Sequence, residues 1–299
     1  MTKDLLDTKE VANYLNINEK QVYHLIKKGR IPATRITGKW LFPKRLIDEW
    51  IETKAKENLT LTPSPASLSD HMIVLGSNDL SLDYLLTRLR QRFPESIIVS
   101  GNVGSMAGLQ ALKEGRAHLS AIHLLDSRTG QYNLPYLKGE KLVLVNLVYR
   151  DQGLMVSPGN PLKIRGLLDA VRKKARFINR QGGSGTRLLL DSLLQDSKIG
   201  PAKVVGYQKE VATHLEVGIE ILRGKADAGL GVLSVARYLG LDFIPLTKER
   251  FDLLIPEEYF FAPQIQSLLA LLGSKDFRER VQELGGYDTT DSGTIIQRG

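Results

Sequence analysis

Residues 71–299 alternate short apolar runs with amphipathic segments, and this alternation constrains the fold more than any other feature of the sequence. It favours an α/β fold, in which we expect largely parallel sheets. The runs expected to form strands are Met72–Leu75, Ile97–Ser100, Leu119–Ile122, Leu142–Val148, Gly153–Val156, Arg176–Ile178, Ala226–Leu230 and Phe243–Leu246. Apolar residues at helical spacing predict helices near residues 80–92, 105–115, 166–174, 186–196, 214–224, 233–239, 262–271 and 276–284.

A break in composition divides the chain. Residues 57–70 contain two prolines and several hydroxyl residues, which disfavour a helix and predict a linker. Residues 1–56 hold twelve Lys/Arg and seven Asp/Glu, a net charge of +5 in a protein whose total is +8. A basic excess on a small segment is typical of a polyanion binder, although a solvated face gives the same pattern. We therefore expect a first domain at 1–56 and a second at 71–299.

The first domain has the pattern of two helices followed by a hairpin. Thr8 is expected to cap a first helix and Asn18 a second helix over residues 19–28, which ends at Gly29. Extended runs at 33–36 and 39–42 flank a tight turn, and Pro43 opens a third helix. This order predicts a winged helix-turn-helix, whose second helix enters the major groove of double-stranded DNA.

Polar and basic residues lie where that geometry requires DNA contacts. Gln21 and His24 face outward on the second helix and are expected to read base edges. The cationic residues expected to contact phosphates are Lys20, Lys27, Lys28 and Arg30 around the second helix, and Arg35 and Lys39 on the wing. Trp40 and Trp50 are expected in the core. The alternative is a helical module for protein interaction.

These residues carry a resemblance to a known family. The runs Thr8–Ala12, Val22–Ala33, Trp40–Lys44 and Ile47–Trp50 resemble the excisionase-type DNA-binding domains, relatives of the MerR winged helices. The resemblance covers about residues 6–52, and it implies DNA binding by this domain. A homodimer is expected, because helix-turn-helix proteins usually bind paired half-sites.

The strongest chemical motif of the second domain is the glycine-rich turn 179–187, Asn-Arg-Gln-Gly-Gly-Ser-Gly-Thr-Arg. It follows a predicted strand and opens a predicted helix, so it presents unpaired backbone N–H groups at the positive end of a helix dipole. Two other turns, 76–79 and 101–105, repeat the arrangement with Gly, Ser and Asn. Each alone is an ordinary helix cap, but the three together predict one anion site.

This arrangement resembles the two-lobed periplasmic solute-binding fold, in its molybdate- and tungstate-binding branch, over about residues 71–299. The resemblance implies a type II domain with one lobe at about 71–150 and 241–299 and the other at about 151–240. It places the ligand in the cleft between them and implies these ligand-binding residues: Ser77, Asn78, Ser105, Arg180, Ser184, Gly185, Thr186, Thr213 and His214. The family's usual tyrosine is not evident at Gly231-Val232.

The same turn is similar to that of phosphate-binding proteins, but Gly182 stands where they have an acidic residue. Phosphate near neutral pH carries a proton and needs an acceptor, whereas molybdate and tungstate need donors only. The sequence therefore favours a bare dianion. Asp79 can supply an acceptor from another turn, so phosphate stays open, as do sulfate and a small organic anion.

Several classes of function are disfavoured. The chain has no cysteine, which excludes disulfides and thiol chemistry, and its five histidines have no metal-ligand spacing. No apolar stretch reaches the roughly 20 residues that span a membrane, and the start lacks a signal sequence, so a cytoplasmic location is expected. The nucleophile-elbow pattern lacks its last glycine, and spacing shows no acid–base pair. We therefore expect a transcriptional regulator that senses molybdate or tungstate, without a cofactor or a metal; an enzyme on the same fold is the competing class.

Overall fold

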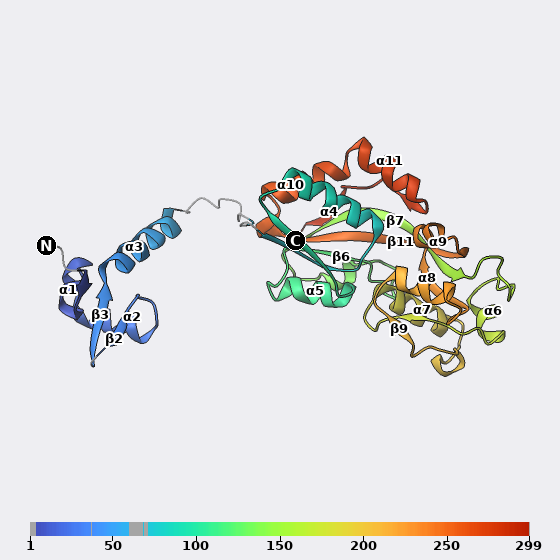
Figure 1. Ribbon diagram of the computed structural model, residues 1–299, viewed down its shortest axis with the longest axis horizontal. Helices are drawn as coiled ribbons and strands as arrows, with labels where there is room; N and C mark the ends of the chain where they lie inside the picture. The colour runs from blue at the N-terminus through green and yellow to red at the C-terminus, as the bar shows by residue number, and fades with distance from the viewer. Residues whose placement is uncertain (1–3, 37, 60–67, 69–70, 299) are drawn as a thin grey trace. The chain divides into compact units, whose positions relative to one another are not determined.

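The computed structural model describes residues 4–36, 38–59, 68 and 71–298. The chain forms two compact units, residues 1–64 and 65–299 (Figure 1). The boundary falls within the segment predicted as a linker, but both ends of that segment are structured. The last helix of the first unit continues to Leu59, and Leu68 is buried in the core of the second unit.

The first unit is a helix-turn-helix with a three-stranded sheet. Its elements are β1 (Leu5–Leu6), α1 (Thr8–Tyr14), α2 (Glu19–Lys27), β2 (Thr34–Ile36), β3 (Lys39–Pro43) and α3 (Lys44–Leu59). The strand order is β1-β3-β2, with both pairs antiparallel. Val11, Val22, Phe42 and Ile47 are fully buried and join the helices to the hairpin.

Local caps decide where the first two helices begin. Asn18 caps α2 as predicted, and its side chain accepts a hydrogen bond from Gln21 N at 2.9 Å. The predicted cap at Thr8 is wrong, because Asp7 caps α1 and Thr8 is its first residue. Asp7 Oδ1 accepts from Glu10 N, while Glu10 accepts in return from Asp7 N. A carboxylate in this position also favours the helix dipole.

The second unit contains one large sheet that extends through two lobes. The strands of this unit are β4 (His71–Gly76), β5 (Ile97–Asn102), β6 (Leu119–Ile122), β7 (Leu142–Val156), β8 (Asn179–Arg180), β9 (Glu210–Val211), β10 (Ala228–Val232), β11 (Asp242–Pro256), β12 (Tyr287–Asp288) and β13 (Ile295–Arg298). Of these, β8 and β9 pair with each other in a separate two-stranded sheet. Its helices are α4 (Leu80–Arg92), α5 (Ser105–Lys113), α6 (Leu167–Arg172), α7 (Gly185–Asp196), α8 (His214–Leu222), α9 (Leu233–Leu239), α10 (Pro263–Leu272) and α11 (Lys275–Leu284). Three short 3-10 turns lie at η1 (Leu134–Tyr136), η2 (Pro201–Lys203) and η3 (Glu257–Tyr259).

The large sheet is mixed, so the prediction of largely parallel sheets is wrong. Its order is β10-β7-β11-β6-β4-β5, and β12 and β13 also pair with β7. Within this sheet β4 pairs in parallel with β5 and β6, whereas β11 runs antiparallel to β6 and β7. In the first lobe, α4 and α10 cover one face of the sheet and α5 covers the other (Figure 1).

Two long strands connect the lobes. The runs predicted separately at Leu142–Val148 and Gly153–Val156 are one strand, β7, which pairs along its whole length with β11. The first half of β7 and the second half of β11 pack in the first-lobe core, while Leu154, Ile244 and Leu246 pack in the second-lobe core. The return crossing therefore lies nearer residue 248 than the predicted 241. Both crossings carry buried polar residues, Arg150 and Gln152 on β7 and Glu249 on β11.

Candidate functional site

Helix N-termini from both lobes meet in the second unit. Ser77 follows β4, Ser105 is the first residue of α5, and their hydroxyl oxygens are 2.8 Å apart. From the other lobe, Ser184 caps α7, and the preceding Gly183 O accepts a hydrogen bond from Met106 N at 3.4 Å. The lobes are therefore in direct contact around the predicted anion-binding turns.

Two glycines allow this contact. A Cβ on Gly185 would clash with the main-chain oxygen of His123 and would lie 2.5 Å from its ring Nδ1. Gly104, the cap of α5, has a φ of 86°, which side chains rarely adopt, and no side chain caps the helix in its place. Among the first N–H groups of α5 and α7, Met106 N donates to Gly183 O and Arg187 N to Ser184 Oγ, and the others precede the first intrahelical hydrogen bonds and remain available as donors.

A buried ion-pair network lies beside these turns, on the crossing strands. Arg150 is fully buried in β7; its Nη1 donates to Asp79 Oδ2 at 2.6 Å and its Nε to Glu249 Oε1. Glu249 Oε1 also accepts from Gln152 Nε2 at 2.7 Å, and its Oε2 lies 2.9 Å from His123 Nδ1. Burial would raise the pKa of Glu249, but Arg150 and His123 hold it at about 2. Glu249 is therefore an ionised acceptor at neutral pH.

Tyr287 connects this network to both lobes. Its hydroxyl lies 2.9 Å and 3.0 Å from the two oxygens of Asp79, the residue that caps α4. The same hydroxyl is 2.9 Å from Ser234 Oγ on α9 of the second lobe. Because the tyrosine proton is donated to the carboxylate, Ser234 must donate to the tyrosine oxygen. Tyr287, on β12, thus links Asp79 of the first lobe to Ser234 of the second.

Arg180 is a buried cation without an acidic partner at hydrogen-bond distance among the described residues. It is only 2% exposed, and Nη2 donates to Ala212 O at 2.8 Å. Its Nε and Nη1 have no hydrogen-bond partner in the described part of the chain. Burial, together with the charge of Arg150, lowers the pKa of Arg180 to about 10. The guanidinium therefore stays charged at neutral pH with two donor groups uncommitted.

Other buried polar atoms are unpartnered in the same region. Arg150 Nη2, His123 Nε2, Asn78 Oδ1 and both ring nitrogens of His214 have no partner within the described residues. Burial, with the charges of Arg180 and Arg150, holds the pKa of His214 well below its ordinary value. Buried polar groups in proteins are normally hydrogen-bonded, so this concentration of unpartnered atoms marks a ligand site.

The predicted ligand-binding residues differ in burial and in whether their polar atoms are free to bind a ligand. The buried members are Ser77, Ser105, Arg180, Ser184, Gly185, Thr186 and His214, and Asn78 is half-buried. Thr213 differs, because its hydroxyl is committed to Glu216 in the capping box of α8. Thr186 Oγ1 accepts from Gln152 Nε2 at 3.2 Å, and Ser184 Oγ accepts from Arg187 N, so each keeps one hydroxyl proton to donate.

Sequence reasoning missed the buried polar network beside the anion-binding turns, three of whose residues lie on β7 and β11. The residues it did not assign to a ligand site are His123, Arg150, Gln152, Glu249 and Tyr287. A signal existed in β7, where Arg150 and Gln152 interrupt a strand that is apolar on either side and yet are both fully buried. Buried charges in a strand are costly unless they are paired, so such an interruption points to a functional cluster.

In the first unit, the predicted DNA-contact residues are all exposed. Lys20, Gln21, His24, Lys27 and Lys28 are exposed on or next to α2. Arg30, Arg35 and Lys39 are exposed on the following turn and the wing. Gln21 has a second role, because its Oε1 accepts from Asn18 N at 3.2 Å and so helps to cap the helix. Tyr23, which the sequence analysis did not single out, is exposed on the same helix.

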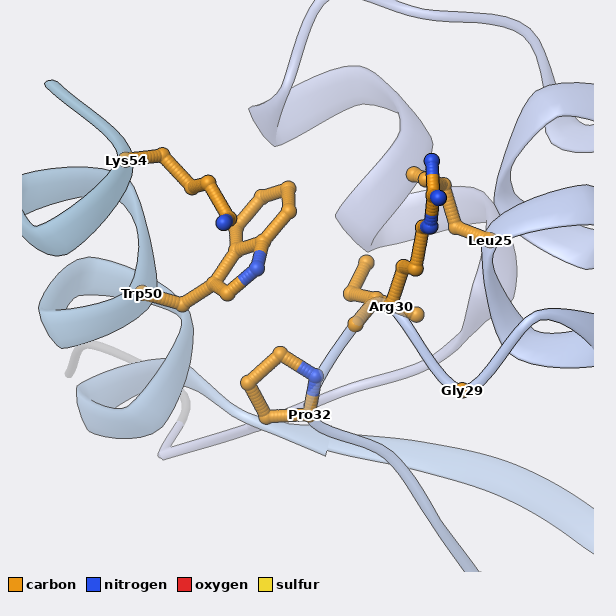
Figure 2. A pocket seen from close by; sticks show the side chains of 7 residues that line it. Leu25, Gly29, Arg30, Pro32, Trp50 and Lys54 are labelled. Carbon is orange, nitrogen blue, oxygen red and sulfur yellow. The ribbon is translucent and has the colours of Figure 1, made fainter. Parts of the chain in front are cut away.

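The first unit also contains an open surface pocket of about 790 Å³. Figure 2 shows Trp50 and Lys54 on α3 facing Leu25, Arg30 and Pro32 across it. Trp50 was expected in the core, but it forms one wall of this open pocket. Among the described residues, the unpartnered buried donors lie in the second unit and not in the lining of this pocket.

No helix among the described residues is long and apolar enough to cross a membrane. No group of three or more His, Cys, Asp or Glu side chains in the same part of the chain could hold a metal ion.

Comparisons with known proteins define the class of both units. Residues 5–55 match the model of a helix-turn-helix domain, and residues 86–273 match that of a PBP superfamily domain. The chain therefore has the architecture of a ligand-responsive DNA-binding regulator, with a small-molecule domain joined to a DNA-binding one. The predicted α/β fold, a winged helix-turn-helix plus a two-lobed type II domain, is confirmed.

The chain belongs to the PBP superfamily, and one curated relative matches it over nearly its full length. It is 32% identical over 298 residues to the uncharacterized protein YvgK of Bacillus subtilis, covering 96% of each chain. An uncharacterized protein in the ferredoxin 2Fe-2S gene 5' region of Clostridium pasteurianum is 34% identical over 110 residues, 36% of this chain and 97% of that one.

Solved structures with low sequence identity share the fold. A putative phosphate ABC transporter substrate-binding protein from Clostridium perfringens, with bound phosphate, aligns with a TM-score of 0.55 at 13% identity. That alignment covers 72% of this chain and 97% of the other. An H2O2-bound mutant of OxyR from Corynebacterium glutamicum aligns with a TM-score of 0.51 at 15% identity, over 93% and 88% of the two chains.

Proposed function

We propose that the second unit binds molybdate or tungstate between its lobes and that this binding controls the attachment of the first unit to DNA. One observation carries the proposal: Arg180 and Arg150 are buried, the charge of Arg150 acts on Arg180, and together they hold three nitrogen donors without a partner among the described residues. A buried cation without an acidic partner, as Arg180 is among the described residues, is expensive, and a bound anion would offset the cost. The N-termini of α5 and α7 add backbone donors and a favourable dipole.

The carboxylates of Asp79 and Glu249 already accept several hydrogen bonds, and this favours a ligand anion without a proton. Asp79 accepts from Arg150, Ser81 and Tyr287, and Glu249 accepts from Arg150, Gln152 and His123. Neither carboxylate therefore has the role of accepting a proton from the ligand, which phosphate would require. The sequence analysis left phosphate as a possible ligand because Asp79 could accept its proton. In the structure Asp79 caps α4 and already accepts these hydrogen bonds, which supports a bare dianion as the ligand.

The tight contact between the lobes favours a ligand of a few atoms. Met106 N and Gly183 O are within 3.4 Å across the cleft, and a Cβ on Gly104 would lie 3.6 Å from Ser184 Cα. A tetrahedral oxyanion presents four oxygens to donors from both lobes within such a space. Because those donors surround it only when the lobes close, the anion favours the closed form.

Calorimetry tests the ligand. Molybdate and tungstate are expected to bind more tightly than sulfate and phosphate. Ser184→Ala should weaken binding by about 1–3 kcal/mol, the cost of one lost donor to a charged ligand. Ser192→Ala, further along α7, is the matched control and should bind as the wild type does. Absence of binding by both metal oxyanions at millimolar concentration would reject the proposed ligand.

An enzyme on this fold is the competing proposal, and one observation bears on it. The pair formed by His123 and Glu249 has the geometry of a base and the acid that orients it. The nearby Ser105 hydroxyl, however, accepts a hydrogen bond from the main-chain N of His123 at 3.1 Å and not from its ring. No described hydroxyl contacts His123 Nε2. We therefore propose binding without turnover.

A further inference from the structure

The charged groups of the proposed anion site balance before a ligand enters. Arg150 and Arg180 contribute two positive charges, and Asp79 and Glu249 contribute two negative ones. The N-termini of α5 and α7 each add about half a positive charge. A bare dianion would therefore leave about one negative charge uncompensated in a site shielded from water. Electrostatics in such a site favours the uptake of one proton with the dianion.

His123 is the group placed to take that proton. Its Nδ1 lies 2.9 Å from Glu249 Oε2, and because Glu249 is an ionised acceptor, Nδ1 carries the hydrogen. In the neutral ring, Nε2 is then a lone-pair acceptor. This nitrogen is buried and has no partner among the described residues. A lone pair next to an oxyanion is repulsive, whereas an N–H at the same atom donates to it.

The surroundings of His123 put its ring at the meeting point of the lobes. Its main-chain N donates to Ser105 Oγ at the start of α5, and its ring packs against Gly185 at the start of α7. Phe251 of β11 meets the ring edge-on, with centroids 5.6 Å apart. The ring is therefore held between the two helix N-termini that supply donors to the proposed ligand.

The other titratable groups around this ring are poorer proton acceptors. Burial and the positive charges of Arg180 on β8 and Arg150 on β7 lower the pKa of His214 on α8, and no described carboxylate contacts its ring. Burial lowers the pKa of His123 too, but Glu249 on β11 opposes that effect. Burial and the charge of Glu249 raise the pKa of Tyr132, so this tyrosine stays neutral. Asp79 at α4 is engaged by Arg150 and Tyr287.

We propose that His123 takes up one proton when the oxyanion binds. A bare dianion such as molybdate binds together with that proton, which is taken from solvent to form an N–H bond at Nε2. The inference rests on the proposed function, and it makes the affinity for molybdate highest at low pH.

The test is calorimetric titration of the full chain with molybdate at pH 8, in HEPES and in Tris. The dependence of the observed enthalpy on the ionisation enthalpy of the buffer counts the protons exchanged. The wild type is expected to take up about one proton, with affinity falling by about tenfold per pH unit. His123→Gln should abolish the uptake and flatten the pH dependence. His118→Gln, at a histidine whose Nδ1 accepts from Ile73 N, is the matched control.

The outcomes separate this inference from the proposed function. Molybdate binding without proton uptake would overturn the inference but not the proposed function. The same holds if proton uptake persists in His123→Gln and is lost in His214→Gln. If neither molybdate nor tungstate binds, the proposed ligand is rejected, and sulfate, another bare dianion, then tests His123 in the same way. If no anion binds, both the proposed function and this inference are rejected. Should His123→Gln misfold, nitrogen NMR of the wild type decides, since Nε2 must gain a proton when molybdate is added.

Discussion

Arg180 is predicted to stabilise the ligand complex at the expense of the unliganded protein. Burial lowers its pKa to about 10, well below that of an ordinary arginine. Each pKa unit corresponds to about 1.4 kcal/mol, so the buried charge costs roughly 3 kcal/mol of folding free energy. Because the charged form is the disfavoured one, this cost is present in full at neutral pH and disappears only above the pKa of the unfolded chain.

Arg180→Met should remove that cost and keep most of the side-chain volume. The variant also loses the hydrogen bond from Nη2 to Ala212 O, worth about 1 kcal/mol. The net expectation is a gain of roughly 2 kcal/mol in the anion-free protein, or about 4–8 °C in melting temperature for a domain of this size. Binding should fall by a factor of at least about 100, since two donors to a charged ligand are lost.

Thermal unfolding with and without molybdate measures both effects. The wild type should be stabilised by the anion, whereas Arg180→Met should melt higher than the wild type without it and show no further shift. Arg172→Met, at an exposed arginine on α6, is the control and should match the wild type in both conditions. A variant that is less stable than the wild type in anion-free buffer would show that Arg180 has a structural role, and the reasoning would be refuted.

Three further predictions concern DNA binding and lobe closure. Lys27→Ala on the exposed face of α2 should weaken DNA binding across sequences and reduce its salt dependence, measured by titration at several salt concentrations, whereas Lys209→Ala in the other unit should not. Tyr287→Phe removes the hydroxyl that joins Asp79 to Ser234, so anion affinity should drop about three- to tenfold, and an unchanged affinity would exclude a role in closure. The affinity of the protein for its operator DNA should change by about 1–3 kcal/mol at saturating molybdate, and the affinity for molybdate must change by the same factor when operator DNA is bound. Equal DNA affinities with and without molybdate would show that the anion does not regulate DNA binding.

Local patterns in the sequence were sufficient for most elements. The helix spacing predicted α4 and α9 to the residue, and Asn18 was identified as a cap because its side chain satisfies a nearby N–H group. The glycine-rich turn before α7 was found for the same reason: its consequences are confined to a few neighbouring residues. The sequence by itself thus determined two units, the helix-turn-helix, and the donor-rich turns.

Only the tertiary structure decided which residues share the site. Arg150 and Glu249 are 99 positions apart, and they meet because β7 and β11 pair antiparallel across both lobes. Sheet direction follows from long-range pairing, which no local period encodes, and so the expectation of parallel strands was wrong. In the sequence Arg150, Gln152 and Glu249 look like ordinary polar residues of a strand exposed to water. Burial at the crossing between two lobes turns them into an ion-pair network, because charges removed from water must find partners in the fold.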